Sequence, residues 1–174
     1  ARPKPVRDLA LRAMNAGVAA VTTPDLRWRR RDVKTVSLLG ASLAKQVAAD
    51  AGVFEAIQVE DDGRVTEGAS RNAWIIDTDG VLKTPPPTPD LLNGITRRVV
   101  LNIATELGVT VKQDWFDVAA MRNAVELFIT SASAFIAPVV RLDDAPIADG
   151  RPGAFATAAL RRYLEGDRPA PAAP

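Results

Sequence analysis

The sequence predicts one α/β domain built around a mixed β-sheet. Strand-like segments alternate with amphipathic helical segments, and two Asp-Gly turns, Asp62-Gly63 and Asp79-Gly80, mark hairpins. The length of 174 residues suffices for one domain with a substantial core but not comfortably for two. Hairpins join antiparallel strands and strand–helix–strand connections join parallel ones, so the combination indicates a mixed sheet.

The first half of the chain is expected to hold two helices and several strands. The expected helices span Val6–Met14 and Leu38–Asp50, the second with Leu39, Leu43 and Val47 on one stripe. The expected strands span residues 17–24, 54–60, 65–77 and 81–84, and residues 26–37 alternate like a further strand.

The second half begins with an extended proline-rich segment, residues 84–90, because prolines lack a donor and restrain the residue before them. Helices are expected at residues 93–107, 119–124 and 154–163, and strands at 109–115, 125–133 and 135–142. We expect residues 1–23 to be an interdomain linker with a first helix and strand. Residues 24–164 would then be the main domain and 165–174 a disordered, proline- and alanine-rich tail.

Composition excludes several classes of chemistry. The chain has no cysteine and no histidine, so thiolate chemistry and a histidine-based triad are excluded, and a zinc site lacks its commonest ligand. A formal net charge of +1 argues against a nucleic-acid binder. No apolar run could cross a bilayer and the start does not resemble a secretory signal, so we expect a cytoplasmic protein without a membrane partner. Acid–base work near neutral pH then falls to Lys, Glu, Asp or Tyr.

Lys34 stands out among five lysines, because it lies in the strand-like stretch DVKTVS that leads directly into a hydrophobic helix. A lysine near a core can lose its proton and attack an aldehyde to form an imine. A single lysine is nevertheless more often a solvated strand residue.

Two segments have the character of phosphate-binding sites. Leu92-Asn93-Gly94-Ile95-Thr96 opens a helix directly after the proline-rich segment, so the Ile95 and Thr96 amides could hold a phosphate. Thr130-Ser131-Ala132-Ser133 places hydroxyl groups at the end of a buried strand. Each has a plainer interpretation, a simple helix cap and a strand-to-loop transition.

Charged residues in two further places have more than one interpretation. Glu67 closes a strand beside a glycine and could pair with a pyridine nitrogen, or it could be an exposed turn residue. Arg27, Arg29 and Arg31 alternate with Trp28 and Arg30, which fits a solvated strand or an anion-binding patch.

In order along the chain, the segments resemble fold-type IV pyridoxal-phosphate (PLP) enzymes, the class-IV aminotransferases, and most closely D-amino-acid aminotransferases. The resemblance rests on a D-V-K-T lysine segment, a T-E-G-x-S-x-N strand and an L-N-G-I-T-R helix start, and extends over most of residues 24–163. It implies a mixed sheet partly closed as a pseudo-barrel with flanking helices.

The resemblance assigns roles to individual residues. Lys34 would form the imine with PLP and shuttle the proton, and Glu67 would pair with the pyridine nitrogen. Leu92 would pack on the ring, and Gly94, Ile95 and Thr96 would hold the phosphate. Ser131 and Ala132 would complete the cofactor site and Ser133 the substrate-carboxylate region. The family commonly has threonine at position 132, so one hydroxyl is missing here.

The resemblance also implies partners: amino acid and 2-oxo acid substrates, a second copy in a homodimer, and an N-terminal domain that precedes this half in family members. We therefore expect this chain to be the cofactor-binding half of such an enzyme. Alternatives are a branched-chain aminotransferase or an aminodeoxychorismate lyase on the same scaffold, or a non-catalytic domain of the PLP fold. Lys34 and Glu67 together argue against the last.

Overall fold

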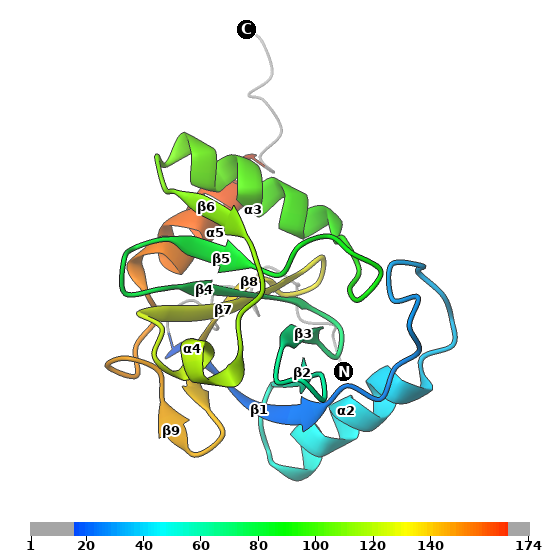
Figure 1. Cartoon of the computed structure of the whole chain (residues 1–174). Helices are drawn as coiled ribbons and strands as arrows, with labels where there is room; N and C mark the ends of the chain where they lie inside the picture. The colour runs from blue at the N-terminus through cyan, green and yellow to red at the C-terminus, as the bar shows by residue number, and fades with distance from the viewer. Residues whose placement is uncertain (1–15, 167–174) are drawn as a thin grey trace, which may run out of the picture.

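The structure is a computed structural model that describes residues 16–166 (Figure 1). The strands are β1 (Val18–Pro24), β2 (Glu55–Val59), β3 (Val65–Gly68), β4 (Asn72–Ile76), β5 (Leu82–Thr84), β6 (Val111–Gln113), β7 (Glu126–Ser131), β8 (Phe135–Leu142) and β9 (Ala145–Pro146). The helices with both ends inside this range are α2 (Leu39–Asp50), α3 (Ile95–Glu106), α4 (Val118–Arg122) and α5 (Ala154–Gly166). The expected helix at 6–14 and residues 167–174 of the expected tail lie outside the described residues. The tail was expected to begin at residue 165, but residues 165 and 166 belong to α5.

The nine strands of this part of the chain form one mixed sheet in the order β3-β2-β1-β8-β7-β4-β5-β6, with β9 paired to β8. The pairs β1–β2, β1–β8 and β5–β6 are parallel, and the other pairs are antiparallel. The sheet curls so strongly that β3, its terminal strand, contacts β4. The prediction of a mixed, partly closed sheet is therefore confirmed.

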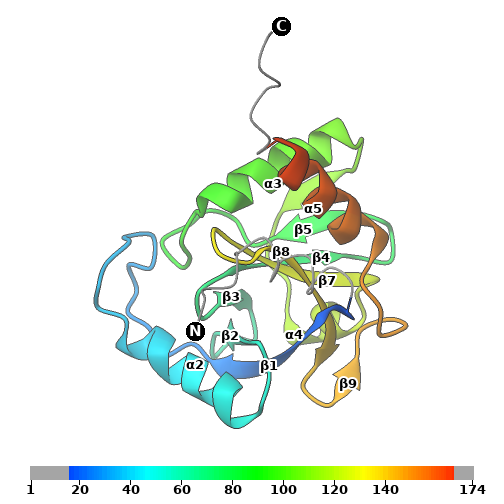
Figure 2. The same cartoon turned by 180° about the vertical axis from the view of Figure 1, so that it is seen from behind.

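The helices cover the sheet in two places (Figures 1 and 2). In both views α3 and α5 lie together along one side, and α2 lies against β1 and β2 on the other. Alternation along β4 separates two cores: Ala73 and Ile75 face the inside of the curled sheet, whereas Trp74 and Ile76 face α3 and α5. Trp74 stacks on Phe128 of β7 with ring centroids 5.6 Å apart.

The strand predicted at residues 26–37 is wrong, because this segment is an irregular loop. Its amides do not join a neighbouring strand: the N–H groups of Arg31 and Asp32 donate to the carbonyl of Pro89, at 2.9 and 3.3 Å. Alternating residue types had suggested a pleat, but two of the arginines are instead drawn inward by carboxylates. Lys34 consequently lies in an exposed loop and not in a strand.

Two smaller expectations also need correction. The strand expected at 65–77 is two strands, β3 and β4, because the chain bends at residues 69–71 and changes partner from β2 to β7. The stripe of Leu39, Leu43 and Val47 on α2 is 74, 48 and 39% exposed. This helix instead packs through Ala44 and Ala48, whose small side chains allow close approach to the sheet.

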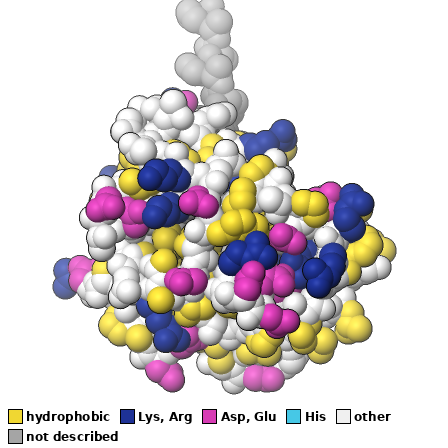
Figure 3. Space-filling model, in the orientation of Figure 1, with side chains coloured by type: hydrophobic (Ala, Val, Ile, Leu, Met, Phe, Trp, Pro, Cys, Tyr) yellow, Lys and Arg dark blue, Asp and Glu magenta, His cyan; other side chains and the backbone are white. Residues whose placement is uncertain are grey.

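The face in Figure 3 carries basic and acidic side chains next to one another, with apolar side chains between them. Charged side chains pair with one another at the surface, such as Arg64 with Asp62 and Arg122 with Asp143, each at 2.7 Å. Within residues 16–166, no helix combines the length and apolar character needed to cross a membrane.

Candidate functional site

A cavity of about 1020 Å³ opens between the loop from β1 to α2, the bend between β3 and β4, the start of α3 and the end of β7. Eight of the nine site residues expected from sequence line it: Lys34, Glu67, Leu92, Gly94, Ile95, Thr96, Ser131 and Ala132. Ser133 does not line it, although its Oγ lies 3.4 Å from that of Ser131. Segments far apart in sequence thus meet at one site.

Glu67, in β3, is the buried carboxylate of the cavity, with only 4% of its surface exposed. Its Oε1 accepts hydrogen bonds from Arg27 Nη1 at 2.5 Å and from the Leu92 amide at 3.2 Å. Its Oε2 accepts one from Asn72 Nδ2 at 2.9 Å. Burial raises the pKa of Glu67 to about 6, although the Arg27 guanidinium acts to lower it. The interpretation of Glu67 as an exposed turn residue is therefore wrong.

Asn72 connects Glu67 to the chain that enters α3. Besides its bond to Glu67, Asn72 Nδ2 donates to the Leu92 carbonyl at 2.7 Å. A Cβ atom on Gly94 would lie 2.6 Å from Asn72 Oδ1, so only glycine permits this approach. Asn72 thus fixes the Glu67 carboxylate relative to the start of α3.

The start of α3 is open towards the cavity. Its N-cap residue, Gly94, has extended backbone angles, and among the described residues no side chain caps the helix. The first helical hydrogen bond runs from the Arg98 amide to the Gly94 carbonyl at 3.2 Å, which leaves the Ile95 and Thr96 amides before it. Thr96 is 2% exposed, yet its Oγ1 has no hydrogen-bond partner in the described part of the chain.

The turn between β7 and β8 forms another wall of the cavity. Ser131 Oγ accepts a hydrogen bond from the Ala134 amide at 3.1 Å, and Thr130 Oγ1 accepts one from Trp74 Nε1 at 3.0 Å. Ala132 lies in the turn, exposed, and offers its backbone but no hydroxyl. The hydroxyl groups here are therefore held by the protein's own hydrogen bonds.

Arg27 is a cavity residue for which the sequence predicted no specific role. Its guanidinium bonds to Glu67 and, through Nη2 at 2.7 Å and Nε at 2.9 Å, to the fully buried carboxylate of Asp25. These two carboxylates raise the pKa of Arg27, despite the opposing effect of burial. The Arg27 guanidinium in turn lowers the pKa of Asp25, although burial of that carboxyl acts to raise it. The run Arg27–Arg31 was the available signal, but it did not distinguish buried from exposed arginines.

The cavity thus brings together three different functional groups. An amine lies at its mouth and a buried carboxylate lies deeper. A helix start offers N–H groups beside a hydroxyl, and neither has a hydrogen-bond partner within residues 16–166. A helix start suits a phosphate, because its amides and dipole both favour negative charge. No group of acidic side chains suited to hold a metal ion occurs within residues 16–166.

Comparison with known proteins defines the family. A sequence model of the family Amino-transferase class IV matches residues 1–142, and the chain belongs to this family. It is 44% identical over 137 residues to a D-alanine aminotransferase of Staphylococcus aureus (strain MSSA476), covering 79% of this chain and 48% of that protein. A D-alanine aminotransferase of Bacillus licheniformis is 42% identical with the same coverage. The chain therefore spans about half the length of these relatives.

Solved structures confirm the fold. A branched-chain amino acid aminotransferase from T.th., solved with pyridoxamine 5'-phosphate, has a TM-score of 0.84 and 31% identity. That match covers 91% of this chain and 54% of the other. The branched-chain amino acid aminotransferase of Thermobaculum terrenum in its PLP-form has a TM-score of 0.81 and 26% identity, covering 87% of this chain and 51% of the other.

Proposed function

We propose that this chain is the cofactor-binding half of a PLP-dependent aminotransferase that exchanges the amino group of a D-amino acid with a 2-oxo acid. The observation that carries the proposal is the meeting of Lys34, the buried Glu67 and the open start of α3 around one cavity. The D-alanine aminotransferases among its relatives support the choice of substrate.

The residues of the cavity fit this cofactor. Thr96 Oγ1 is a buried polar atom without a partner in the described residues, at a helix start that has no side-chain cap. A phosphate there would accept from this hydroxyl and from the Ile95 and Thr96 amides. Glu67 would face the pyridine nitrogen, and Leu92 would pack on a face of the ring. Ser131 and Ala132 would complete the cofactor site. Ser133 would lie towards the substrate carboxylate.

When bound, the cofactor supplies the aldehyde that captures the amino group and the ring that withdraws electrons. The protein orients it and moves protons. Lys34 Nζ would take the Cα proton from the donor amino acid and return a proton later in the same half-reaction. Glu67, held by Arg27 and Asn72, would keep a negative charge beside the ring nitrogen. Substrates, homodimer formation and the contribution of a preceding domain belong to the same proposal.

Reductive labelling tests the role of Lys34. The purified chain is mixed with PLP, its absorption is recorded at about 410 nm, where a protein-bound PLP imine absorbs, and borohydride and peptide mapping follow. We expect the band, and a label at Lys34. Lys34→Ala should remove both, whereas Lys45→Ala, which changes an exposed lysine of α2, should remove neither. A label spread over several lysines would contradict the proposal.

The branched-chain aminotransferase reaction is the second candidate, because the similar solved structures named above are of branched-chain aminotransferases. The higher identity to D-alanine aminotransferases, 44% against 31%, favours the first. D-alanine and L-leucine, compared as amino donors to one 2-oxo acid, separate the two candidates. Transfer from L-leucine alone would overturn the choice of substrate.

A further inference from the structure

Arg31 lies three residues before Lys34 and is almost completely buried, with 5% of its side chain exposed. Its Nη1 contacts Glu60 at the end of β2 and lies 3.7 Å from Asp90 Oδ1. Its Nε lies 3.5 Å from Asp25 Oδ2, the same carboxylate that Arg27 binds. One guanidinium therefore connects three carboxylates from separate segments.

The backbone beside this side chain makes the same connection. The Arg31 amide donates to the Pro89 carbonyl at 2.9 Å and the Asp32 amide to the same oxygen at 3.3 Å. Main chain and side chain together join the loop that carries Lys34 to the proline-rich segment before α3. The two loops lie side by side in both views (Figures 1 and 2).

The proline-rich segment in turn leads along the chain into the candidate phosphate site. Two residues after Asp90, the Leu92 amide donates to Glu67 and its carbonyl accepts from Asn72. Gly94 and the start of α3 follow directly. Arg31 thus links the amine on one loop to the segment that positions both the carboxylate and the helix start.

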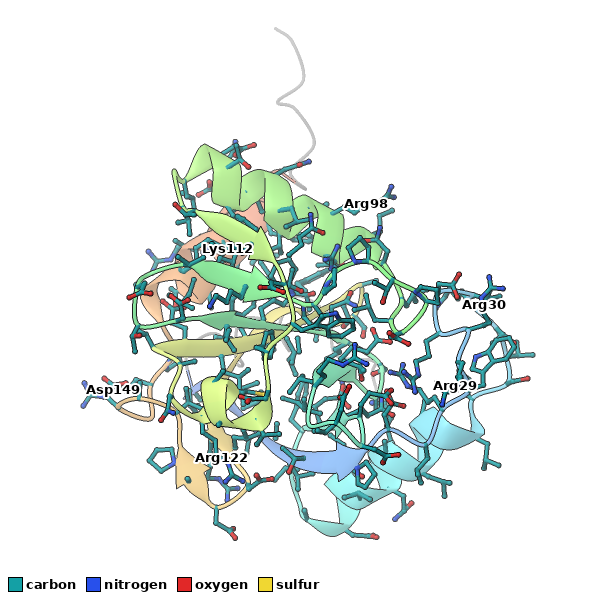
Figure 4. The ribbon with its side chains drawn as sticks, in the orientation of Figure 1. Arg29, Arg30, Arg98, Lys112, Arg122 and Asp149 are labelled. Atoms are coloured by element: carbon teal, nitrogen blue, oxygen red, sulfur yellow. The ribbon has the colours of Figure 1, made fainter. Side chains whose placement is uncertain are left out.

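The neighbouring arginines do not make this connection. Arg29 and Arg30 are exposed on the outer part of the same loop (Figure 4), and Arg30 pairs with Asp32 at 2.9 Å within it. An exposed pair of this kind contributes little to stability, whereas a buried network is disrupted when one member is removed. Arg30 is therefore a matched control for Arg31.

We propose that Arg31 is a positioning residue that sets the distance between Lys34 and the phosphate site at the start of α3. This inference rests on the proposed function, because it assigns Arg31 a role towards the same cofactor. Small displacements of a reacting group lower its effective concentration strongly. Residues 32–38, between Arg31 and α2, are exposed apart from the half-buried Thr35, so Lys34 depends on this anchor for its position.

The test compares PLP with pyridoxal, which offers the same aldehyde without the phosphate. In the unaltered chain, PLP should label Lys34 much faster than pyridoxal does, because the phosphate site delivers the aldehyde to the amine. Arg31→Met should lower this ratio about tenfold or more and leave the slow labelling by pyridoxal unchanged. Arg30→Met should leave the ratio unchanged.

Two further measurements keep the test independent of misfolding. Circular dichroism and thermal unfolding show whether Arg31→Met folds. Asp90→Asn weakens the contact between Arg31 and Asp90 by changing its other, half-exposed member. Asp90→Asn should lower the ratio in the same direction. In the chain without PLP, the backbone amides of positions 31 and 32 should exchange hydrogen faster in Arg31→Met than in Arg30→Met.

The outcomes separate the two proposals. An unchanged PLP-to-pyridoxal ratio in both Arg31→Met and Asp90→Asn, with Lys34 still labelled, would overturn the role of Arg31 alone. No label at Lys34 in the unaltered chain would refute the proposed function and, with it, any role of Arg31 towards the cofactor.

Discussion

Two helices of this domain, α3 and α5, begin in the same way but differ in what satisfies their first turns. Each starts after a glycine, Gly94 or Gly153, whose carbonyl accepts the first helical hydrogen bond. At α5 the buried carboxylate of Glu126 accepts from the Phe155 and Ala156 amides, at 2.8 and 3.0 Å. At α3 the nearby buried carboxylate, Glu67, bonds to Leu92, outside the helix.

The difference in capping supports the proposed phosphate site at the start of α3. A carboxylate satisfies the free amides and the dipole of a helix start, so α5 needs nothing further. The Glu126 side chain fits so closely that a Cβ atom on Gly153 would overlap its carboxyl group. The α3 start has the same requirement, and within the described residues no side chain meets it. This supports an anion from outside the chain.

The largest effect on stability is expected from removing the Glu126 carboxylate that caps the start of α5. Glu126→Ala leaves two buried amides without an acceptor and creates a cavity, so it should lower the free energy of unfolding by about 3 kcal/mol. Urea unfolding followed by circular dichroism measures this. Glu106→Ala, which removes an exposed carboxylate paired with Arg162, should cost about 0.5 kcal/mol or less. Equal losses in the two variants would contradict the assignment of Glu126 as the cap.

A smaller effect is expected from the pH dependence of Glu67. Its pKa is raised from 4.5 to about 6 in the folded state, which therefore binds the proton more tightly than the unfolded state. Its stabilising contribution is complete below pH 4.5 and is lost as the pH rises through 6. The stability of the unaltered chain relative to Glu67→Gln should thus fall by about 2 kcal/mol between about pH 4 and 7. A difference that stays constant with pH would show that burial does not hold the proton on Glu67.

The smallest effect on stability is expected at the start of α3, which no side chain of the described residues caps. Thr96→Val removes a buried hydroxyl that lacks a partner in the described residues, so the free energy of unfolding should stay the same or rise by about 1 kcal/mol. Affinity for PLP should fall about tenfold, because a hydrogen bond to a charged group is lost. Thermal unfolding and fluorescence titration measure the two quantities. A loss of stability with unchanged affinity would assign Thr96 to the fold and not to the site.

The sequence predicted the features that depend on local patterns. The grouping of Lys34, Glu67 and Thr96 at one site followed from the resemblance of three motifs to a known family, whereas Asp-Gly turns located the hairpins and helical spacing located α2, α3 and α5. These signals are local because turn geometry and helix periodicity act over a few residues.

Features that depend on distant partners were not predictable in the same way. Arg27 and Arg31 are buried and Arg29 and Arg30 exposed, because the carboxylates that select them include Glu60 and Glu67, which lie much further along the chain. The same holds for Glu126, whose partners at the start of α5 lie 29 and 30 residues further on. The four arginines of the run Arg27–Arg31 are alike in sequence and differ only in what the fold places beside them.

The most direct test of the open helix start follows the backbone amides of α3 and α5 by NMR while PLP is added. If the start of α3 holds the phosphate, the Ile95 and Thr96 resonances shift as PLP binds. Those of Phe155 and Ala156, already bonded to Glu126, stay in place. Binding of PLP without shifts at Ile95 and Thr96, or with equal shifts at both helices, would contradict the claim that the open start of α3 holds the phosphate.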